Sequence, residues 1–360
     1  MLVYKEDWDE ATGVLDAWWR GEELPRPVVQ VTAPRSEPMH DVPAPPEPTS
    51  LEDRWLNPDV VIGRALRGMA RTYYGGESYP HLWVNIGPGI AASYMGADVT
   101  FAEDTVWFGR NHTMDWEQIL SIRYDPENRW WKATKHLVSE AARRNDGRYI
   151  VGTTDLGGVT DILASLRGTL NLLTDLVDHP EEVKAASDII IDLWHRYYEE
   201  LNDLIFRGQE GTSAWMGIWC PGRWYPLQCD FSYMISPAMF EEFVLPWLAE
   251  QCRRLNHSIY HWDGPGQIPH LDLLLSIPEL DGIQWTPGAG NPGLGDERWF
   301  PLYKRILDAG KRLVLLGMSA EEIRTFLREF PCRGVLISTW AGSPQEADAL
   351  LRDIERWSRR

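Results

Sequence analysis

His261 and Asp263 stand where a short apolar run, residues 258–260, gives way to a glycine–proline turn. Extended backbone alternates its side chains between two faces, so this imidazole and carboxylate are expected to point to the same side. Such a pair can transfer protons as an acid and a base, or it can bind zinc, which accepts both donor types and leaves a position open for substrate in catalytic sites. The alternative is a hydrogen-bonded pair that only orders the end of a strand.

Polar residues follow other apolar runs of the sequence as well. Gln284 and Trp285 follow one run, Asp155 follows a second, and Asn85 ends a third. The carboxyl ends of parallel strands meet at one face of an α/β barrel, so these residues are expected to line one pocket. Asp155 joins the histidine–aspartate pair as a catalytic candidate, or only begins a glycine-rich turn. Gln284, Trp285 and Asn85 are substrate-binding candidates.

Residues 213–222 are rich in tryptophan and are expected to form a strand that opens into a loop at the same face. Trp215 and Trp219 could stack on a substrate, although core packing is the usual fate of such rings. Cys220 could be a thiolate ligand or a small buried hydrophobic residue. Asp230 could bind substrate or cap a loop. The candidate metal ligands are His261 and Asp263, with Cys220, or alternatively Cys229 or Asp230, as the third.

Strand-like and helix-like segments alternate along most of the chain. A helix is expected at 7–20 and a strand at 28–32, and the further strands are expected at 81–85, 149–153, 213–218, 258–261, 282–284, 313–316 and 334–338. This alternation predicts an α/β fold with a parallel sheet, and the number of repeats favours a closed (β/α)8 TIM barrel. Residues 1–75 are expected to form an N-terminal helical and extended addition that packs on a barrel of residues 76–360. Within the addition, residues 36–50 are proline-rich and predict an extended loop.

Three stretches resemble the uroporphyrinogen decarboxylase superfamily. They are His-Trp-Asp-Gly at 261–264, Ser-Pro-Ala-Met-Phe-Glu-Glu-Phe-Val-Leu-Pro at 236–246 and Gln-Trp-Thr-Pro-Gly at 284–288. The resemblance covers roughly residues 155–340 and is closest to the cobalamin-dependent methyltransferase-like branch. It implies a TIM barrel, and Asp230 matches the aspartate that precedes the Ser-Pro-x-x-Phe helix in the superfamily.

The methyltransferase branch holds zinc through a His-x-Cys motif and a later cysteine, and the zinc activates the group that exchanges a methyl with cobalamin. Here Asp263 stands at the position of the first cysteine, and residues 338–341 contain no later one. A His/Asp site is harder and binds soft ligands more weakly. The resemblance therefore implies a methyltransferase-like enzyme that moves a methyl group between a small substrate and a corrinoid, either free or on a carrier protein, with zinc as a possible aid.

Two other functions are compatible with the same residues. One is a metal-independent decarboxylase or lyase of the superfamily, in which the histidine and the aspartates act as acid and base. Uroporphyrinogen decarboxylation itself is disfavoured, because the acidic segment 36–50 replaces the arginine-rich loop that grips substrate carboxylates. The other is a barrel without catalysis whose tryptophans, among 19 in the chain, hold a sugar or an aromatic compound.

Composition limits the partners and the compartment. The net charge of −18 disfavours nucleic acid and anionic membranes, which require a basic face. Four scattered cysteines do not suggest a disulfide framework, and neither a signal-peptide core nor an apolar run of membrane-spanning length is evident. A cytoplasmic protein is therefore expected, while the oligomeric state does not follow from the sequence.

Overall fold

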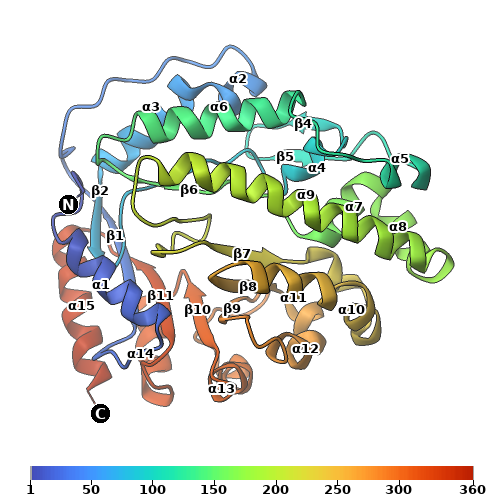
Figure 1. Cartoon of the computed structure of the whole chain (residues 1–360). Helices are drawn as coiled ribbons and strands as arrows, with labels where there is room; N and C mark the ends of the chain where they lie inside the picture. Colours follow the sequence, from blue (N-terminus) through green and yellow to red (C-terminus); the bar gives the residue numbers. More distant parts are fainter. Residues whose placement is uncertain (1, 360) are drawn as a thin grey trace.

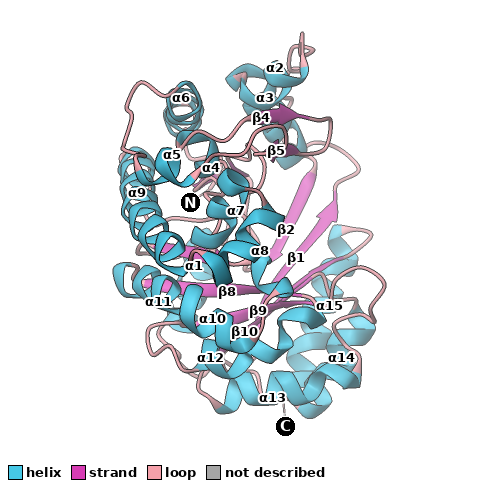
Figure 2. Cartoon of the chain, turned by 90° about the vertical axis from the view of Figure 1, so that its right-hand side faces the viewer, coloured by secondary structure: helices cyan, strands magenta, loops and turns pink. Residues whose placement is uncertain are grey.

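A seven-stranded sheet forms the centre of the computed structural model, which describes residues 2–359 (Figures 1 and 2). Its strand order is β2-β1-β11-β10-β9-β8-β7, and every neighbouring pair is parallel except β2 with β1. The strands are β1 (Val28–Pro34), β2 (Thr72–Gly76), β7 (Trp224–Gln228), β8 (His257–Asp263), β9 (Gly282–Thr286), β10 (Arg312–Leu316) and β11 (Val335–Trp340).

Two smaller sheets complete the strand structure. β3 (His81–Trp83) pairs in parallel with β6 (Ile150–Gly152), and an isolated parallel bridge links Gly152 to Ser213. β4 (Val99–Phe101) and β5 (Val106–Phe108) form an antiparallel hairpin. The fold is therefore α/β with a mostly parallel central sheet, as the alternation predicts. It is compatible with a TIM-barrel-like arrangement, although within residues 2–359 no continuous ladder joins β3 and β6 to the larger sheet.

Helices connect the strands and cover the outer face of the sheet (Figure 1). They are α1 (Trp8–Trp19), α2 (Leu51–Leu56), α3 (Pro58–Ala70), α4 (Ala91–Tyr94), α5 (Trp116–Leu120), α6 (Arg129–Arg143), α7 (Val159–Arg167), α8 (Thr169–Asp178), α9 (Pro180–Phe206), α10 (Pro237–Phe243), α11 (Leu245–Arg254), α12 (Leu271–Leu275), α13 (Phe300–Asp308), α14 (Ala320–Glu329) and α15 (Pro344–Ser358). The 3-10 helices of the described residues are η1 (Asp230–Met234), η2 (Pro265–His270) and η3 (Glu297–Trp299). No helix within residues 2–359 is long and apolar enough to cross a membrane.

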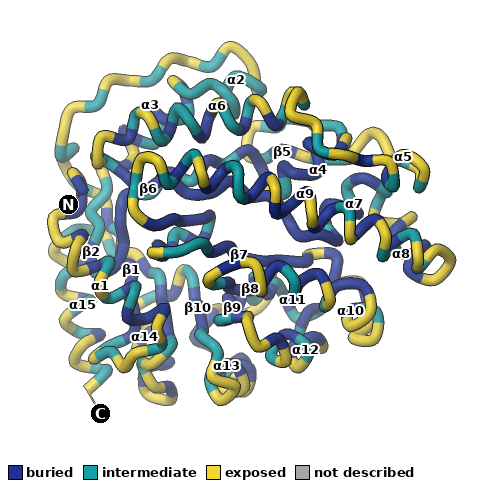
Figure 3. The backbone as a smooth tube through the Cα atoms, in the orientation of Figure 1, coloured by how far each residue is buried: buried dark blue, intermediate teal, exposed yellow. Residues whose placement is uncertain are grey.

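The two faces of the sheet belong to different apolar cores, and the central strands are largely buried (Figure 3). Ile259 and Val314 pack in a core that includes α1 and the segment 214–220. Tyr260, the residue after Ile259 on β8, and Ile283 of β9 pack in the larger core, which includes residues of the surrounding helices. Because side chains alternate along a strand, each residue's position in the strand decides which of these two cores its side chain joins.

The N-terminal residues are part of the sheet rather than an addition packed on it. β1 pairs in parallel with β11 from Val28 to Thr32, so the predicted boundary at residue 75 divides one sheet. The predicted helix and strand of this region are confirmed, and residues 41–48 run without regular structure as their prolines predict.

One local prediction is wrong. Residues 213–218 form a turn-containing loop with a single bridge instead of a strand, and the strand of this region is β7, whose residues the sequence pattern assigns to a loop. Pro226 lies inside β7, and a proline in a strand interior disfavours that assignment. The helical segment after Ser236 is interrupted between α10 and α11, close to Pro246, because proline cannot donate the intrahelical hydrogen bond.

Candidate functional site

Polar side chains of three neighbouring strands meet at the carboxyl ends of β7, β8 and β9. In the sheet register, His261 is the partner of Gln228 on one side and of Gln284 on the other. Residues paired across parallel strands share a face, so all three side chains leave the sheet on the same side as Ile259, away from the helix layer. The convergence predicted for His261 and Gln284 is present.

The imidazole of His261 is held in place by two contacts. Its Nδ1 is hydrogen-bonded to Oε1 of Gln284, whose Nε2 in turn donates to Thr286 Oγ1 at 2.7 Å. The edge of Trp215 packs against the ring at 5.0 Å between centroids. With Nδ1–H donating to the amide oxygen, the lone pair of Nε2 is left for a ligand. Among residues 2–359, no side chain or backbone group makes a hydrogen bond to that Nε2 or to the carboxylate of Asp263.

Asp155 lies three residues after the end of β6 and is 6% exposed. Its carboxylate accepts hydrogen bonds from Gly157 N at 2.9 Å and from the Tyr225 hydroxyl at 3.2 Å. Burial raises the pKa of this carboxyl to about 6, and the charge of nearby His261 acts in the opposite direction. Asp155 therefore lies close enough to His261 for their charges to interact.

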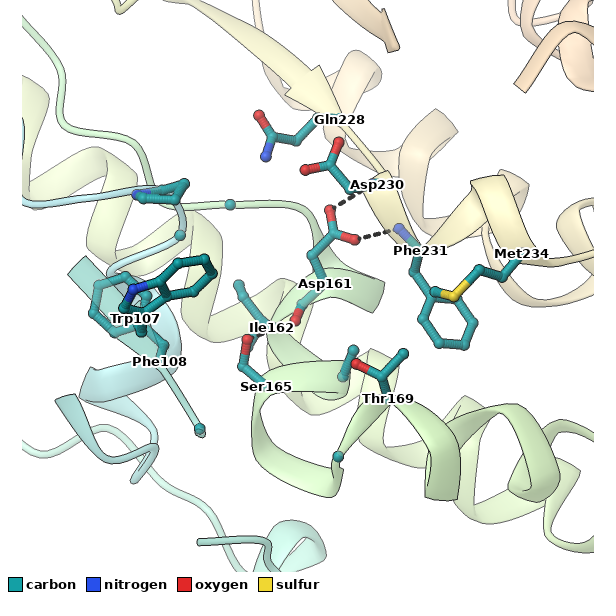
Figure 4. Close-up of a pocket in the computed structure, with 16 residues that line it drawn as sticks. Trp107, Phe108, Asp161, Ile162, Ser165, Thr169, Gln228, Asp230, Phe231 and Met234 are labelled. Atoms are coloured by element: carbon teal, nitrogen blue, oxygen red, sulfur yellow. Dashed lines mark hydrogen bonds between the residues drawn. The ribbon is translucent and has the colours of Figure 1, made fainter. Parts of the chain in front are cut away.

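Asp161 and Asp230 form a carboxylate pair beside this cluster (Figure 4). Asp161, in the first turn of α7, accepts hydrogen bonds from the backbone N–H groups of Asp230 at 3.0 Å and Phe231 at 2.8 Å, which orients the start of η1. Burial and the neighbouring Asp230 charge raise the pKa of Asp161 to about 7. Asp161 is absent from the residues that the sequence nominates, because a carboxylate in the first turn of a helix usually serves only the helix dipole.

The two aspartates line a pocket of about 420 Å³. Its opposite wall carries Trp107 and Phe108 of the β4–β5 hairpin, and Gln228 projects into it from the end of β7 (Figure 4). Nothing in the local sequence marks Trp107 as a pocket residue, since only the tertiary fold brings the hairpin over the strand ends.

Asn85 lies at a separate pocket of about 320 Å³, where it is joined by Trp83, Arg54 and Arg64. Its side-chain oxygen accepts a hydrogen bond from Gly87 N at 2.8 Å, so part of its bonding capacity serves the turn after β3. The structure thus places Asn85 at a cavity, but not at the one that Asp230 lines.

Cys220 and Trp219 lie at the amino ends of the strands, which corrects their predicted place in the pocket. Trp219 packs edge-on against Trp8 of α1 at 5.8 Å, and its backbone oxygen accepts from Trp19 Nε1. Cys220 is fully buried in the same core, and burial raises the pKa of its thiol to about 12. The loop after residue 213 runs toward α1, so only Trp215 reaches His261.

Trp285 also lies outside the pocket. It is fully buried in the helix-layer core, with its ring 4.6 Å from that of Trp262 and 5.1 Å from that of Trp299. Gln284 and Trp285 are consecutive in β9, so they must point to opposite faces, and only Gln284 faces the site.

A zinc site built from His261, Asp263 and Cys220 does not fit this arrangement. Cys220 follows Trp219, whose backbone oxygen accepts a hydrogen bond from Trp19, and Trp19 stacks on His257. His257 is four residues before His261 on β8, which corresponds to about 13 Å along a strand. Within residues 2–359, no group of three or more His, Cys, Asp or Glu side chains is placed to hold a metal ion. The sequence prediction of this ligand set is therefore wrong.

Replacement of Asp230 by asparagine is expected to stabilise the protein at pH 8 and not at pH 5. The pKa of Asp161 is higher in the folded protein than its value near 4 in the unfolded chain, so folding favours the protonated carboxyl. The stabilisation from this preference is complete below about pH 4 and is lost as the pH rises toward about 7. Removing the Asp230 charge lowers that pKa, so the gain at pH 8 should be on the order of 1 kcal/mol after solvent screening. Urea unfolding at both pH values measures it. Asp178→Asn, at the exposed end of α8, is the matched control, and equal gains at both pH values would contradict the coupling.

Comparisons with known proteins identify the fold. No protein-family model matches the chain, and no curated protein matches it. Among the solved structures, a methyltransferase from Methanosarcina mazei is similar, with a TM-score of 0.61 and 14% sequence identity over 96% of this chain and 98% of that chain. At this identity the likeness concerns the fold, and it extends over nearly the full length of both proteins.

Proposed function

We propose that this protein is an enzyme that moves a methyl group between a small substrate and a corrinoid, with its reaction at the carboxyl ends of β7, β8 and β9. The observation that carries the proposal is the anchored imidazole of His261, whose Nε2 is free at a polar site. The full-length likeness to a methyltransferase supports the choice of reaction. The closed (β/α)8 barrel implied by the superfamily is part of the same proposal.

His261 would act as the proton-transferring group. A substrate that accepts a methyl group on oxygen, sulfur or nitrogen gives up a proton, and Nε2 is the basic position that Gln284 leaves available. Gln284 is a positioning residue, because its amide fixes which ring nitrogen carries the proton. Asp155, with its pKa near 6, would take part in holding or releasing that proton.

A corrinoid would supply the cobalt centre that carries the methyl group. Exposed aromatic side chains at the rim of the site provide flat apolar surface for its macrocycle. They are Trp107, which is 48% exposed, and Tyr233 of η1, which is 56% exposed. A rim of this kind would suit a corrinoid delivered by a carrier protein. Zinc has no role in the proposal, because the side chains present do not form its ligand set.

The second candidate is a metal-independent decarboxylase or lyase. Asp155 beside His261, with pKa raised to about 6, is an acid–base arrangement that favours it. The negative charge of the site argues against this candidate, because carboxylates near His261 would repel an anionic substrate. These carboxylates are Asp155, Asp161, Asp230 and Asp263. Methyl transfer to or from an uncharged or cationic substrate meets no such penalty.

Methylcobalamin mixed with the purified protein and a panel of thiol, alcohol and amine acceptors is expected to lose its methyl group, with a rate that EDTA leaves unchanged. The corrinoid absorption spectrum follows the reaction directly. Loss of the rate with EDTA, restored by zinc, would contradict the metal-free site. No change of the corrinoid spectrum, together with carbon dioxide release from a carboxylic acid substrate in a bell-shaped pH profile, would establish the second candidate instead.

A further inference from the structure

The pocket of Figure 4 carries acidic side chains and no basic ones. Asp161 and Asp230 are its charged lining residues, and none of its lining residues is lysine or arginine. Asp155 and Asp263 add negative charge close by. In a partly enclosed cavity this charge is screened less than on an open surface, so the pocket disfavours anions and favours cations.

A second, independent feature points into the same cavity. Gln228 is 8% exposed, and its side-chain amide makes no hydrogen bond among residues 2–359. The amide projects from the end of β7 into the pocket, beside Asp230 (Figure 4). The amide therefore offers the cavity a donor and an acceptor that no residue uses, so a ligand with a polar group at this point gains hydrogen bonds.

The remaining walls suit an organic cation better than a metal ion. Trp107 and Phe108 form one side, and Phe231 and Met234 line the other (Figure 4). Aromatic faces attract alkylammonium groups, whereas a divalent ion requires a shell of oxygen ligands. Trp107 already holds a cation, since the guanidinium of Arg110 lies 5.3 Å from the centre of its ring, and Arg110 is not among the lining residues.

We propose that this pocket binds the ammonium head of a small organic cation, between the carboxylates of Asp161 and Asp230 and the ring of Trp107, with Gln228 contacting the polar part of the same molecule. The inference rests on the proposed function in one respect, because it takes this cation to be the substrate of methyl transfer. The volume of about 420 Å³ is within the range of small-molecule sites.

Isothermal titration calorimetry with choline and with its uncharged isostere 3,3-dimethylbutan-1-ol tests the proposal at constant ionic strength. Choline is expected to bind saturably and the isostere at least roughly tenfold more weakly, since only choline carries the charge. Asp230→Asn and Trp107→Ala should each weaken choline binding by roughly fivefold or more. Both residues are exposed, so neither substitution threatens the fold.

Two matched variants serve as controls. Asp178→Asn removes a carboxylate outside the pocket and Trp340→Ala removes an exposed indole that does not line it, and both should bind choline as the wild type does. Equal affinity for choline and the isostere, or no saturable binding of choline, would overturn the proposal. The titration contains no corrinoid and requires no turnover. A failed methyl-transfer assay with intact choline binding would therefore refute the proposed function and leave the cation site in place.

Discussion

The His261→Ala variant is expected to lose at least about a hundredfold in kcat while remaining folded. A positioned general base contributes about a hundredfold to ten-thousandfold to a rate, and no other imidazole in the described residues shares this position between Gln228 and Gln284. The side chain is only half-buried and its single hydrogen bond is to Gln284, so its loss should cost little stability. The measurement is the rate of corrinoid-dependent methyl transfer under saturating substrate.

His112→Ala is the matched control, because His112 is an exposed histidine after the β4–β5 hairpin. It should keep the wild-type rate and the wild-type circular dichroism spectrum. If His261→Ala retained full activity, the assignment of the reaction to this site would be wrong. If it lost activity and also its thermal transition, the result would reveal a structural role instead.

The Trp285→Ala variant is expected to lose about 3–5 kcal/mol of unfolding free energy. The residue has no exposed surface and fills the space between Trp262 and Trp299, so truncation leaves a cavity in the helix-layer core. Trp285→Phe should recover much of the loss, because the indole N–H of Trp285 makes no hydrogen bond. Denaturant unfolding measures the free energies.

Trp340→Ala removes the same type of side chain from the surface, and its stability should change by no more than about 0.5 kcal/mol. Substrate affinity distinguishes a packing role of Trp285 from the predicted role in substrate binding. A folded Trp285→Phe variant that binds substrate normally would support the packing role, whereas normal stability with lost affinity would show that the ring reaches the pocket after all.

Much of the architecture follows from local sequence patterns. The apolar runs around Ile259, Ile283 and Val314 form parallel strands, and the amphipathic segments between them form helices. The polar residues after these runs gather at one end of the sheet because parallel strands all finish on the same side. The order of residues along the chain therefore predicts that His261, Gln284 and Asp155 lie toward the same edge of the fold.

Other predictions failed where local patterns carry no information about distant contacts. Residues 213–218 look like a strand, but Gly217 turns the loop back so that its oxygen accepts a hydrogen bond from Gln30 of β1, and Cys220 joins the core beneath α1. The strand β7 contains Pro226, and its pairing partners lie far away along the chain. A parallel sheet tolerates this proline only at its edge, which is where β7 stands in the seven-stranded sheet.

The α/β class and the polar character of the strand ends are properties of the sequence, because both follow from periodicity and chain direction. Which of two consecutive residues faces the site, as for Gln284 and Trp285, is set by tertiary packing, since the phase of a strand depends on what packs against it. Tertiary packing also brings Asp161 and Asp230 together opposite Trp107, because three separate segments have to fold together for their side chains to line one pocket. Electrostatic coupling depends on the distance between charges in space, and the spacing of residues along the chain does not determine that distance.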